Sequence, residues 1–349
     1  MAVAVVAKGK VIHLRGYGVR DLAAMRTGIA RHDLLWGIDV FPREELVRRI
    51  RFIQPNQDFR TAWQYQNLMF TTAGYLAGRV DGGGWEALVR RRVLQPLGMT
   101  RASPVHLQGG AFNGQELIRR ADSRAMQSPQ MAMSRGMAWE AGEFPELSDE
   151  GYGMGFLVTH YRGHKMVHHP GNWDGWSLEL SFLPNDSLGV VVLTNMYSTT
   201  LRDFLPWLLY DRLLGLPNSR WSDRFLARAA RGRALQVAAR AREDSARIAG
   251  TTPSHPLDAY AGRYQHPAYG EAVVTRDGDT LRLRFGNFEF PLSHYHYDSF
   301  RYEPPAGDPT YNRFRWRVSF LTGLDGSVET LLAPLEPAVA PLPFTRIKP

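Results

Sequence analysis

The sequence predicts an α/β (α+β) domain with one antiparallel sheet flanked by helices, followed by a small, all-β, barrel-like domain. Three observations predict this class. Helical patterns between residues 41 and 94 precede four strand-like segments between residues 151 and 195. A further amphipathic helical pattern follows the strands at residues 201–214. From about residue 255 the chain changes to short alternating runs punctuated by glycine-containing turns.

The amino-terminal segment alternates in the manner of two strands and predicts a β-hairpin over residues 2–20. Gly9 lies between its halves, AVAVVAK and VIHLRGYGV, and can supply the positive φ that a tight turn needs. The next periodic segments predict helices over residues 41–53, 63–80 and 85–94.

An antiparallel meander is predicted from residue 151 onward. The segments are GYGMGFLVTHY, HKMVHHPG, WSLELSFLPN and LGVVVLTN, with Asn185 and Asp186 in the last turn. Val190–Leu193 is apolar enough to predict a central strand. Residues 100–150 carry few periodic patterns, so we expect mostly loop there.

These elements predict three parts of the chain. Residues 1–216 form the domain with the sheet, residues 217–254 an arginine-rich helical linker, and residues 255–349 the small β domain. In the last part the alternation LRLRF predicts a sheet covered on one face, as in a small barrel or half-barrel.

The composition is that of a globular chain without cysteine. Of the 349 residues, 44% are hydrophobic and 22% are charged, which is enough to bury a substantial core. The absence of cysteine excludes disulfides, thiolate metal sites and cysteine nucleophiles. We expect no cofactor and no metal site.

The net charge of +8 would favour acidic partners such as nucleic acid if it were gathered on one face. Only four of the 42 basic residues are lysines, and the arginines are dispersed along the chain, often near Asp or Glu. The densest stretch, Arg220–Arg247, alternates arginines with apolar residues at helical spacing, which favours a solvated helix. We therefore expect no nucleic-acid partner.

No segment approaches the roughly 18 uninterrupted apolar residues that a membrane helix needs, so no membrane span is predicted. The first residues lack the basic region and the small-residue cleavage site of a signal peptide. The protein is therefore expected in the cytoplasm as the sequence stands, and outside the cell if the true start lies upstream.

Two short motifs are candidates for chemistry. Tyr65-Gln66-Asn67 precedes a helical pattern, where a hydroxyl and an amide can project from a loop; the alternative is a packed tyrosine beside a helix-capping asparagine. His169-Pro170-Gly171 lies in the predicted meander, where a glycine lets a ligand backbone approach closely; the alternative is a tight turn and an ordinary strand histidine.

The surroundings of both motifs resemble the serine β-lactamase-related, penicillin-binding-protein-like family, which includes class C β-lactamases, D-aminopeptidases and esterases. The first resemblance runs from Trp63 to Thr100, and the second continues through FLPN and VVVLTN. Residues 255–349 resemble the small β domain often appended to such hydrolases, particularly at YAGRYQHPAYG and PLSHYHYDSF.

The resemblance implies roles for individual residues. Tyr65 would take part in proton transfer, and Asn67 would bind the amide of the substrate. His169 and Gly171 would stand for the Lys-Thr-Gly or His-x-Gly of the family's edge strand, and the N–H of Asn172 would stabilise an oxyanion. The implied catalytic residues are Tyr65 and His169, and the implied ligand is a small molecule or peptide with an amide or ester carbonyl.

The nucleophile of this family lies on a Ser-x-x-Lys motif, which this sequence lacks. Serine would be needed three residues before a lysine, and the four positions hold Val5, Ala7, Arg162 and Thr345. Thr345 lies in a proline-flanked segment of the second domain and is a poor candidate. Other serines of the first domain have no lysine or histidine at an activating spacing; these are Ser123, Ser128, Ser134 and Ser177.

The Ser-x-x-Lys motif is more consistent with having been lost with a whole segment than with having been changed by a point replacement. GKVIHLRGYGVRDL resembles the family's first hairpin and MRTGIARHDLLW the loop that normally follows the nucleophile helix, yet only Leu22–Ala24 separate them. We therefore expect losses near residues 21–25 and near residues 103–107, which would remove core helices and leave the fold incomplete.

Three functional hypotheses follow. The chain is a β-lactamase-related serine hydrolase of doubtful activity, a non-catalytic protein that binds peptides or acyl groups, or the incomplete gene product of an active hydrolase. The oligomeric state is not predicted.

Histidines could also suggest a metal site. In a strand, however, His164 and His168 face one way and His169 the other, without a carboxylate at a recognisable spacing. His294 and His296 share one strand face, but their aromatic neighbours favour packing at a barrel rim.

Overall fold

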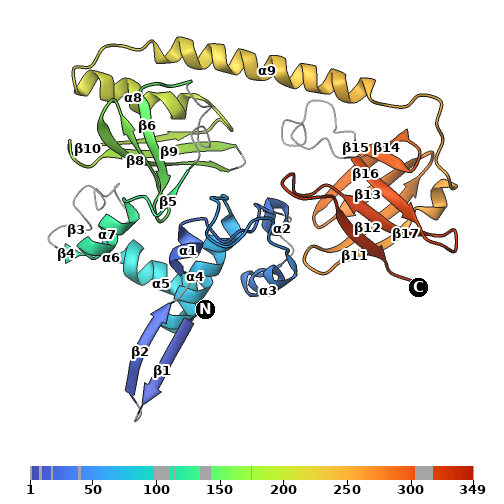
Figure 1. The fold of residues 1–349 in the computed structure, drawn as a ribbon, viewed down its shortest axis with the longest axis horizontal. Helices are drawn as coiled ribbons and strands as arrows, with labels where there is room; N and C mark the ends of the chain where they lie inside the picture. The colour runs from blue at the N-terminus through green and yellow to red at the C-terminus, as the bar shows by residue number, and fades with distance from the viewer. Residues whose placement is uncertain are drawn as a thin grey trace. The chain divides into compact units, whose positions relative to one another are not determined.

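The computed structural model divides into two compact units, each built from separate stretches of the chain (Figure 1). The sheet unit contains Met1–Gly28, Asp58–Trp63 and Thr72–Val237, and the barrel unit contains Ile29–Gln57, Gln64–Thr71 and Ala238–Pro349. The structure describes residues 2–7, 10–16, 19–37, 41–97, 111–112, 115–133, 143–173, 175–302 and 317–348.

The sheet unit is built on six antiparallel strands in the order β10-β9-β8-β7-β6-β5. The predicted meander is therefore confirmed. The bounds are β5 Met131–Ala132, β6 Leu147–Tyr152, β7 Leu157–Tyr161, β8 His164–Trp173, β9 Trp176–Leu183 and β10 Leu188–Thr194.

The prediction that Val190–Leu193 forms a central strand is wrong, because β10 is the last strand in the order of the described sheet. Val192 is buried, whereas Val191 and Leu193 are 52% and 74% exposed. The apolar run suggested burial on both faces, but only one face of β10 is covered.

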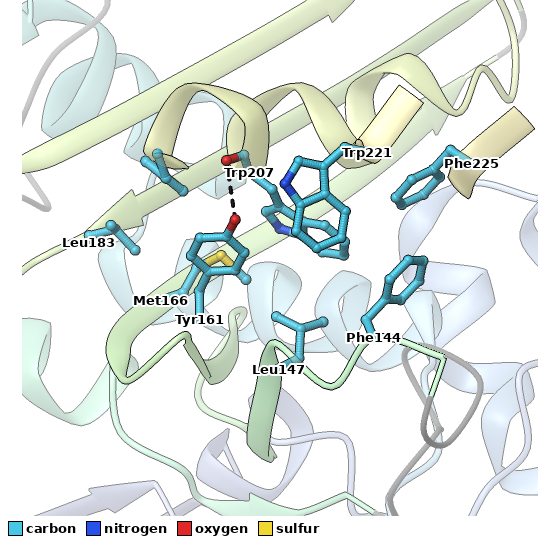
Figure 2. Packing of buried hydrophobic residues seen from close by; sticks show 9 residues of the cluster. Phe144, Leu147, Tyr161, Met166, Leu183, Trp207, Trp221 and Phe225 are labelled. Carbon is cyan, nitrogen blue, oxygen red and sulfur yellow. Dashed lines mark hydrogen bonds between the residues drawn. The ribbon is translucent and has the colours of Figure 1, made fainter. Parts of the chain in front are cut away.

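Helices α8 (Leu201–Leu213) and α9 (Trp221–Ser245) contribute to an aromatic core on the sheet, as Figure 2 shows. Trp207 of α8 and Trp221 of α9 meet edge to face, with ring centroids 5.0 Å apart. The buried members of this core are Phe144, Leu147, Tyr161, Met166, Leu183, Trp207, Tyr210, Trp221 and Phe225.

The first turns of α9 are thus part of the core, whereas the sequence predicted a solvated helical linker. Trp221 and Phe225 lie one turn apart, and both are buried. Arg224 forms a salt bridge with Glu146 between them. The many arginines of this helix hid a short apolar face from the sequence pattern.

The predicted amino-terminal hairpin and helices agree with the structure in kind but differ at their ends, and the elements at residues 19–23, 111–112, 115–116 and 120–126 were not predicted. The predicted hairpin is confirmed as β1 with β2, while its turn at Gly9 lies outside the described residues. α4 begins at Asn67, not at Trp63, and the helix predicted over 85–94 consists of an α, a π and a second α segment. The bounds are β1 Ala2–Ala7, β2 Lys10–Gly16, α1 Val19–Ala23, α4 Asn67–Asp81, α5 Gly84–Val89, η2 Arg90–Leu94, α6 Gln95–Leu97, β3 Ala111–Phe112, β4 Gln115–Glu116 and α7 Arg120–Met126.

The carboxy-terminal strands close into an eight-stranded antiparallel barrel, which confirms the predicted barrel-like domain. Its interior is filled by aromatic side chains, among them Tyr260, Tyr264 and Phe300. The bounds are η3 Leu257–Ala259, β11 Gly262–His266, β12 Gly270–Asp277, β13 Thr280–Phe285, β14 Phe288–His296, β15 Ser299–Tyr302, β16 Arg317–Thr322, β17 Val328–Ala333 and β18 Leu342–Arg346.

Residues 29–57 pack on this barrel, although they precede it by some two hundred residues of chain. The ring of Phe41 lies against Gly270, where a Cβ would approach it to 2.8 Å, and Gly270 also has a φ of +84°. The guanidinium of Arg49 covers the Phe41 ring and donates to the carbonyl oxygen of Ala268. The helices of this stretch are α2 Asp33–Gly37, α3 Arg43–Arg49 and η1 Ile50–Phe52.

Among the helices that the structure describes, none has both the length and the apolar character required to cross a bilayer.

Candidate functional site

Gln66 and Asn67 fix the first motif at the start of α4. The side chain of Gln66 is fully buried, and its Nε2 donates to the carbonyl oxygen of Ala30 at 2.6 Å. Asn67 is the first residue of α4, and its Nδ2 donates to Oδ1 of Asp33 at 3.3 Å. Both bonds tie the motif to residues 30–33, which precede it by more than thirty residues.

Tyr65 packs beneath a cation in the same unit. The guanidinium of Arg31 lies 4.8 Å from the centroid of the Tyr65 ring. Burial raises the pKa of Tyr65 above its usual value of 10, although the positive charge of Arg31 partly opposes this effect. The hydroxyl is therefore protonated at neutral pH, so that it can donate a hydrogen bond but cannot act as a resident base.

Asp33 connects the residues around this motif. Its Oδ1 accepts from Trp36 Nε1 at 3.1 Å as well as from Asn67, and its Oδ2 accepts from Arg31 Nε at 2.6 Å. Arg31, Asp33 and Trp36 were not among the site residues predicted from the sequence. The available signal was their position in ARHDLLW, at the end of the loop that already resembled the family.

His169 of β8 forms the centre of the second motif. Its Nδ1 lies 2.7 Å from the carbonyl oxygen of Pro170, which can only accept, so Nδ1 carries the proton. Nε2 then accepts the hydroxyl of Tyr152 at 3.2 Å. Burial lowers the pKa of His169, so the imidazole is neutral at pH 7. Tyr152 is a further residue that was not predicted from the sequence.

β8 is an interior strand over its first half and an edge strand over its second. Residues 164–168 pair with β7 on one side, whereas residues 169–173 pair only with β9 among the described strands. His169, Pro170 and Gly171 therefore lie at an edge of the sheet that the structure describes. Such an edge presents backbone groups that can pair with an extended ligand.

Gly171 lies where this edge is most tightly packed. A Cβ there would come within 2.9 Å of the side chain of Leu178 on β9. The carbonyl oxygen of Gly171 accepts from Arg202 Nη1 at 2.6 Å, which braces the strand from α8. The carboxamide oxygen of Asn172 accepts the hydroxyl of Ser177 at 2.8 Å, so this side chain is held against β9.

The structure gathers the predicted site residues into one group within each unit. Tyr65 and Asn67 belong to the barrel unit, where they share contacts with Arg31 and Asp33. The other predicted residues follow one another along β8 in the sheet unit; they are His169, Gly171 and Asn172.

The serines considered as substitute nucleophiles make ordinary structural bonds. Ser123 is buried and accepts from Gln127, and Ser128 donates to the backbone carbonyl of Arg124 in α7. Ser177 donates to Asn172, and Ser134 lies outside the described residues. None of these partners is a base that would activate a hydroxyl.

The histidines of the sheet unit pair with different carboxylates. His164 contacts Asp186 at 2.9 Å, and buried His168 contacts Glu179 at 3.0 Å. Within the part of the chain that the structure describes, no three His, Cys, Asp or Glu side chains are arranged to hold a metal ion.

Comparison with known proteins adds family relationships. Residues 19–139 match the family described as Beta-lactamase, and residues 246–346 match a domain of unknown function (DUF3471). Unguisins hydrolase of Aspergillus campestris (strain IBT 28561) is 25% identical over 315 residues, covering 74% of this chain and 58% of that protein. Unguisins hydrolase of Aspergillus violaceofuscus (strain CBS 115571) is 24% identical over 343 residues, covering 76% and 59%.

The chain thus spans less than two thirds of the length of these two relatives. Among solved structures, the octameric penicillin-binding protein homologue from Pyrococcus abyssi aligns over 93% of this chain and 77% of its own, with 16% identity and a TM-score of 0.49. The family match over residues 19–139 includes the Tyr65 motif, and the hydrolase relatives extend over most of the chain. The family match and the two hydrolase relatives support a serine β-lactamase and penicillin-binding-protein-like family for this chain, with serine hydrolase ancestry.

Proposed function

We propose that this chain binds amide or ester carbonyl compounds but forms no acyl-enzyme. The observation that carries the proposal is the environment of Tyr65. Tyr65 is half-buried, the pKa of its hydroxyl is raised, and the cation at its ring is Arg31. No serine stands three residues before any of the four lysines. The site therefore lacks both a base that could remove a proton from a nucleophile and a serine nucleophile that could be acylated.

The second half of β8 supports binding. Over residues 169–173 the strand pairs on one side only among the described strands, and Gly171 places no side chain on that edge. His169 is neutral and already holds the hydroxyl of Tyr152, so it adds polarity without positive charge. Such an edge can pair with an extended carbonyl compound through its backbone groups.

The two fungal relatives suggest where to begin the search for a ligand. Both are named as hydrolases of unguisins. We include unguisins among the compounds to test, together with peptides containing D-amino acids and β-lactams.

Covalent labelling and binding test the two halves of the proposal separately. The full chain is incubated with a fluorescent penicillin and with a fluorophosphonate, and its intact mass is then measured. We expect the mass to stay unchanged. A serine peptide that carries either label would overturn the claim that no acyl-enzyme forms.

Calorimetric titration with the same compound classes tests binding. We expect saturable binding that the substitution Gly171→Val weakens and that Asp223→Ala, on an exposed face of α9, leaves unchanged. Indifference of the cooperatively folded chain to all three classes would overturn the binding half.

A second candidate is the incomplete product of a gene for an active hydrolase. The observation that favours it is the separation of two family-like segments by Leu22–Ala24 alone. Sequencing genomic DNA across codons 20–26 tests it, because an in-frame segment with Ser-x-x-Lys would restore a conventional enzyme. An uninterrupted coding sequence identical to this chain would overturn it.

A further inference from the structure

We propose that the carboxy-terminal barrel positions Tyr65 and Asn67, and that it does so through His32. The barrel residues in this role are Tyr269 and Glu336. We call them positioning residues because they act on Tyr65 and Asn67 through His32. This inference goes beyond ligand binding, because it assigns a task to the barrel itself.

His32 is attached to the barrel by two buried hydrogen bonds. Its backbone N–H donates to Oε2 of Glu336 at 2.7 Å, and its Nδ1 lies 2.7 Å from the hydroxyl of Tyr269. All three residues are almost completely buried. Buried polar bonds are costly to leave unmade, so these two contacts hold His32 in one place.

The backbone of His32 adds to this constraint. Its φ is +47°, in the left-handed region that residues with a side chain seldom occupy. Such a conformation persists only where surrounding contacts over-determine it. The contacts that fix His32 come from the barrel residues Tyr269 and Glu336, which lie 237 and 304 residues away along the chain.

The neighbours of His32 on both sides hold the Tyr65 motif. Ala30 accepts the side-chain amide of Gln66, and Arg31 covers the ring of Tyr65. Asp33 accepts from Asn67 and from Trp36 through the same oxygen. Every contact of the motif described above is therefore made by residues within four positions of His32.

Further polar contacts fasten the same stretch to the barrel. Arg49 donates to the carbonyl oxygens of Pro267 and Ala268, and Asn56 donates to that of Ala338. These hydrogen bonds are directional, and they hold the stretch of chain whose residues contact Tyr65 and Asn67. The geometry therefore points to the barrel as a support for this motif.

Hydrogen exchange in the full chain tests the proposal without any ligand, so its outcome is independent of the proposed function. Tyr269→Phe removes the hydroxyl that meets His32 but keeps the ring in the barrel core. The matched control is Tyr264→Phe, which removes another buried barrel hydroxyl, one that donates to the carbonyl oxygen of Tyr260 at 2.8 Å. We expect Tyr269→Phe to accelerate exchange about tenfold at residues 30–35 and 64–70, and Tyr264→Phe to leave these residues unchanged.

A spectroscopic signal at the motif provides a second readout. The chain contains nine tryptophans, so 5-fluorotryptophan labelling gives few signals, and Trp36→Phe identifies that of Trp36. We expect the Trp36 signal to move in Tyr269→Phe and in Glu336→Gln but not in Tyr264→Phe. Glu336→Gln keeps the shape of the side chain and serves if Tyr269→Phe does not fold.

Two results would overturn the proposal. One is equal acceleration at residues 64–70 in Tyr269→Phe and Tyr264→Phe, which would mean that the barrel stabilises the unit only in general. The other is faster exchange at residues 30–35 with residues 64–70 and the Trp36 signal unchanged, which would mean that His32 is held by the barrel without affecting the motif.

Discussion

The hydroxyl of Tyr161 donates a 2.5 Å hydrogen bond to Oδ1 of Asp211, and both side chains are buried in the sheet unit. The second carboxylate oxygen, Oδ2, accepts from Trp221 Nε1 at 2.7 Å, and Arg162 lies 3.3 Å from Oδ1. One carboxylate thus joins β7, α8 and α9. Burial and the neighbouring carboxylate raise the pKa of Tyr161, so this hydroxyl remains a donor.

Asp211→Ala should therefore destabilise the sheet unit strongly. The substitution leaves the indole N–H of Trp221 without its acceptor and the hydroxyl of Tyr161 with only the more distant carbonyl oxygen of Trp207, at 3.3 Å. We expect a loss of about 3–5 kcal/mol in the free energy of unfolding. Urea unfolding measures this loss. Asp223→Ala, which breaks an exposed pair between α9 and Arg220, is the control and should change little. Equal effects of the two substitutions would contradict the role of Asp211.

Two glycine-to-alanine substitutions in helices should change the free energy of unfolding in opposite directions. A Cβ at Gly78 would lie 2.3 Å from the backbone nitrogen of Trp85, so Gly78→Ala forces α4 and α5 apart and should cost at least about 3 kcal/mol. At Gly232, in α9, a Cβ meets nothing within 4 Å, so Gly232→Ala should stabilise by about 1 kcal/mol. Thermal unfolding of both variants is the measurement, and a stabilised Gly78→Ala would be inconsistent with the close approach.

The edge of β8 can be probed with a double-mutant cycle. Gly171→Ala places a Cβ within 2.9 Å of Leu178, and we expect a loss of about 1–2 kcal/mol. Leu178 is partly exposed, and Leu178→Ala removes the atoms that would clash. The pair should therefore show a favourable coupling of about 1 kcal/mol in urea unfolding. Additive losses would show that the cost of Gly171→Ala comes from elsewhere.

The barrel should lose stability as the pH falls. Burial first, and then the nearby His32, lower the pKa of His266 to about 4, below its ordinary value of 6.5. The unfolded chain therefore binds a proton before the folded chain does. The contribution of neutral His266 is complete above pH 6.5 and is lost between pH 6.5 and about 4, by at most about 3 kcal/mol.

His266→Asn is the matched variant for this titration. The Nδ1 of His266 accepts the backbone N–H groups of Ala268 and Tyr269, and an asparagine oxygen can accept them without titrating. Urea unfolding of both proteins from pH 7.5 to 4.5 isolates the histidine, because all other groups are shared. Parallel pH profiles would refute this assignment.

The parts of the fold that sequence predicted are those specified by local pattern. The alternation in WSLELSF and the two-residue turns of the barrel predict strands without knowledge of their partners. Leu201–Leu213 is similarly recognisable, because its apolar residues recur at helical spacing. The candidate residues Tyr65 and His169 were found through resemblance and not through pattern.

The remaining features depend on contacts between distant residues. Trp221 and Phe225 are only two apolar positions in an arginine-rich helix, so their burial could not be read from periodicity. The partnership of His32 with Glu336 spans most of the chain and has no local signal. Tyr152 is likewise paired with His169 only by the register of the sheet.

The attachment of His32 to Glu336 also has a consequence for folding during synthesis. At about 5–20 residues per second, the ribosome completes Glu336 roughly 15–60 s after His32. Throughout that interval residues 29–57 and 64–71 have been synthesised, but the barrel on which they pack is still incomplete. These early stretches must therefore avoid non-native contacts until translation is almost complete. A stop codon near the end of the gene would disrupt the structure of residues near the amino terminus.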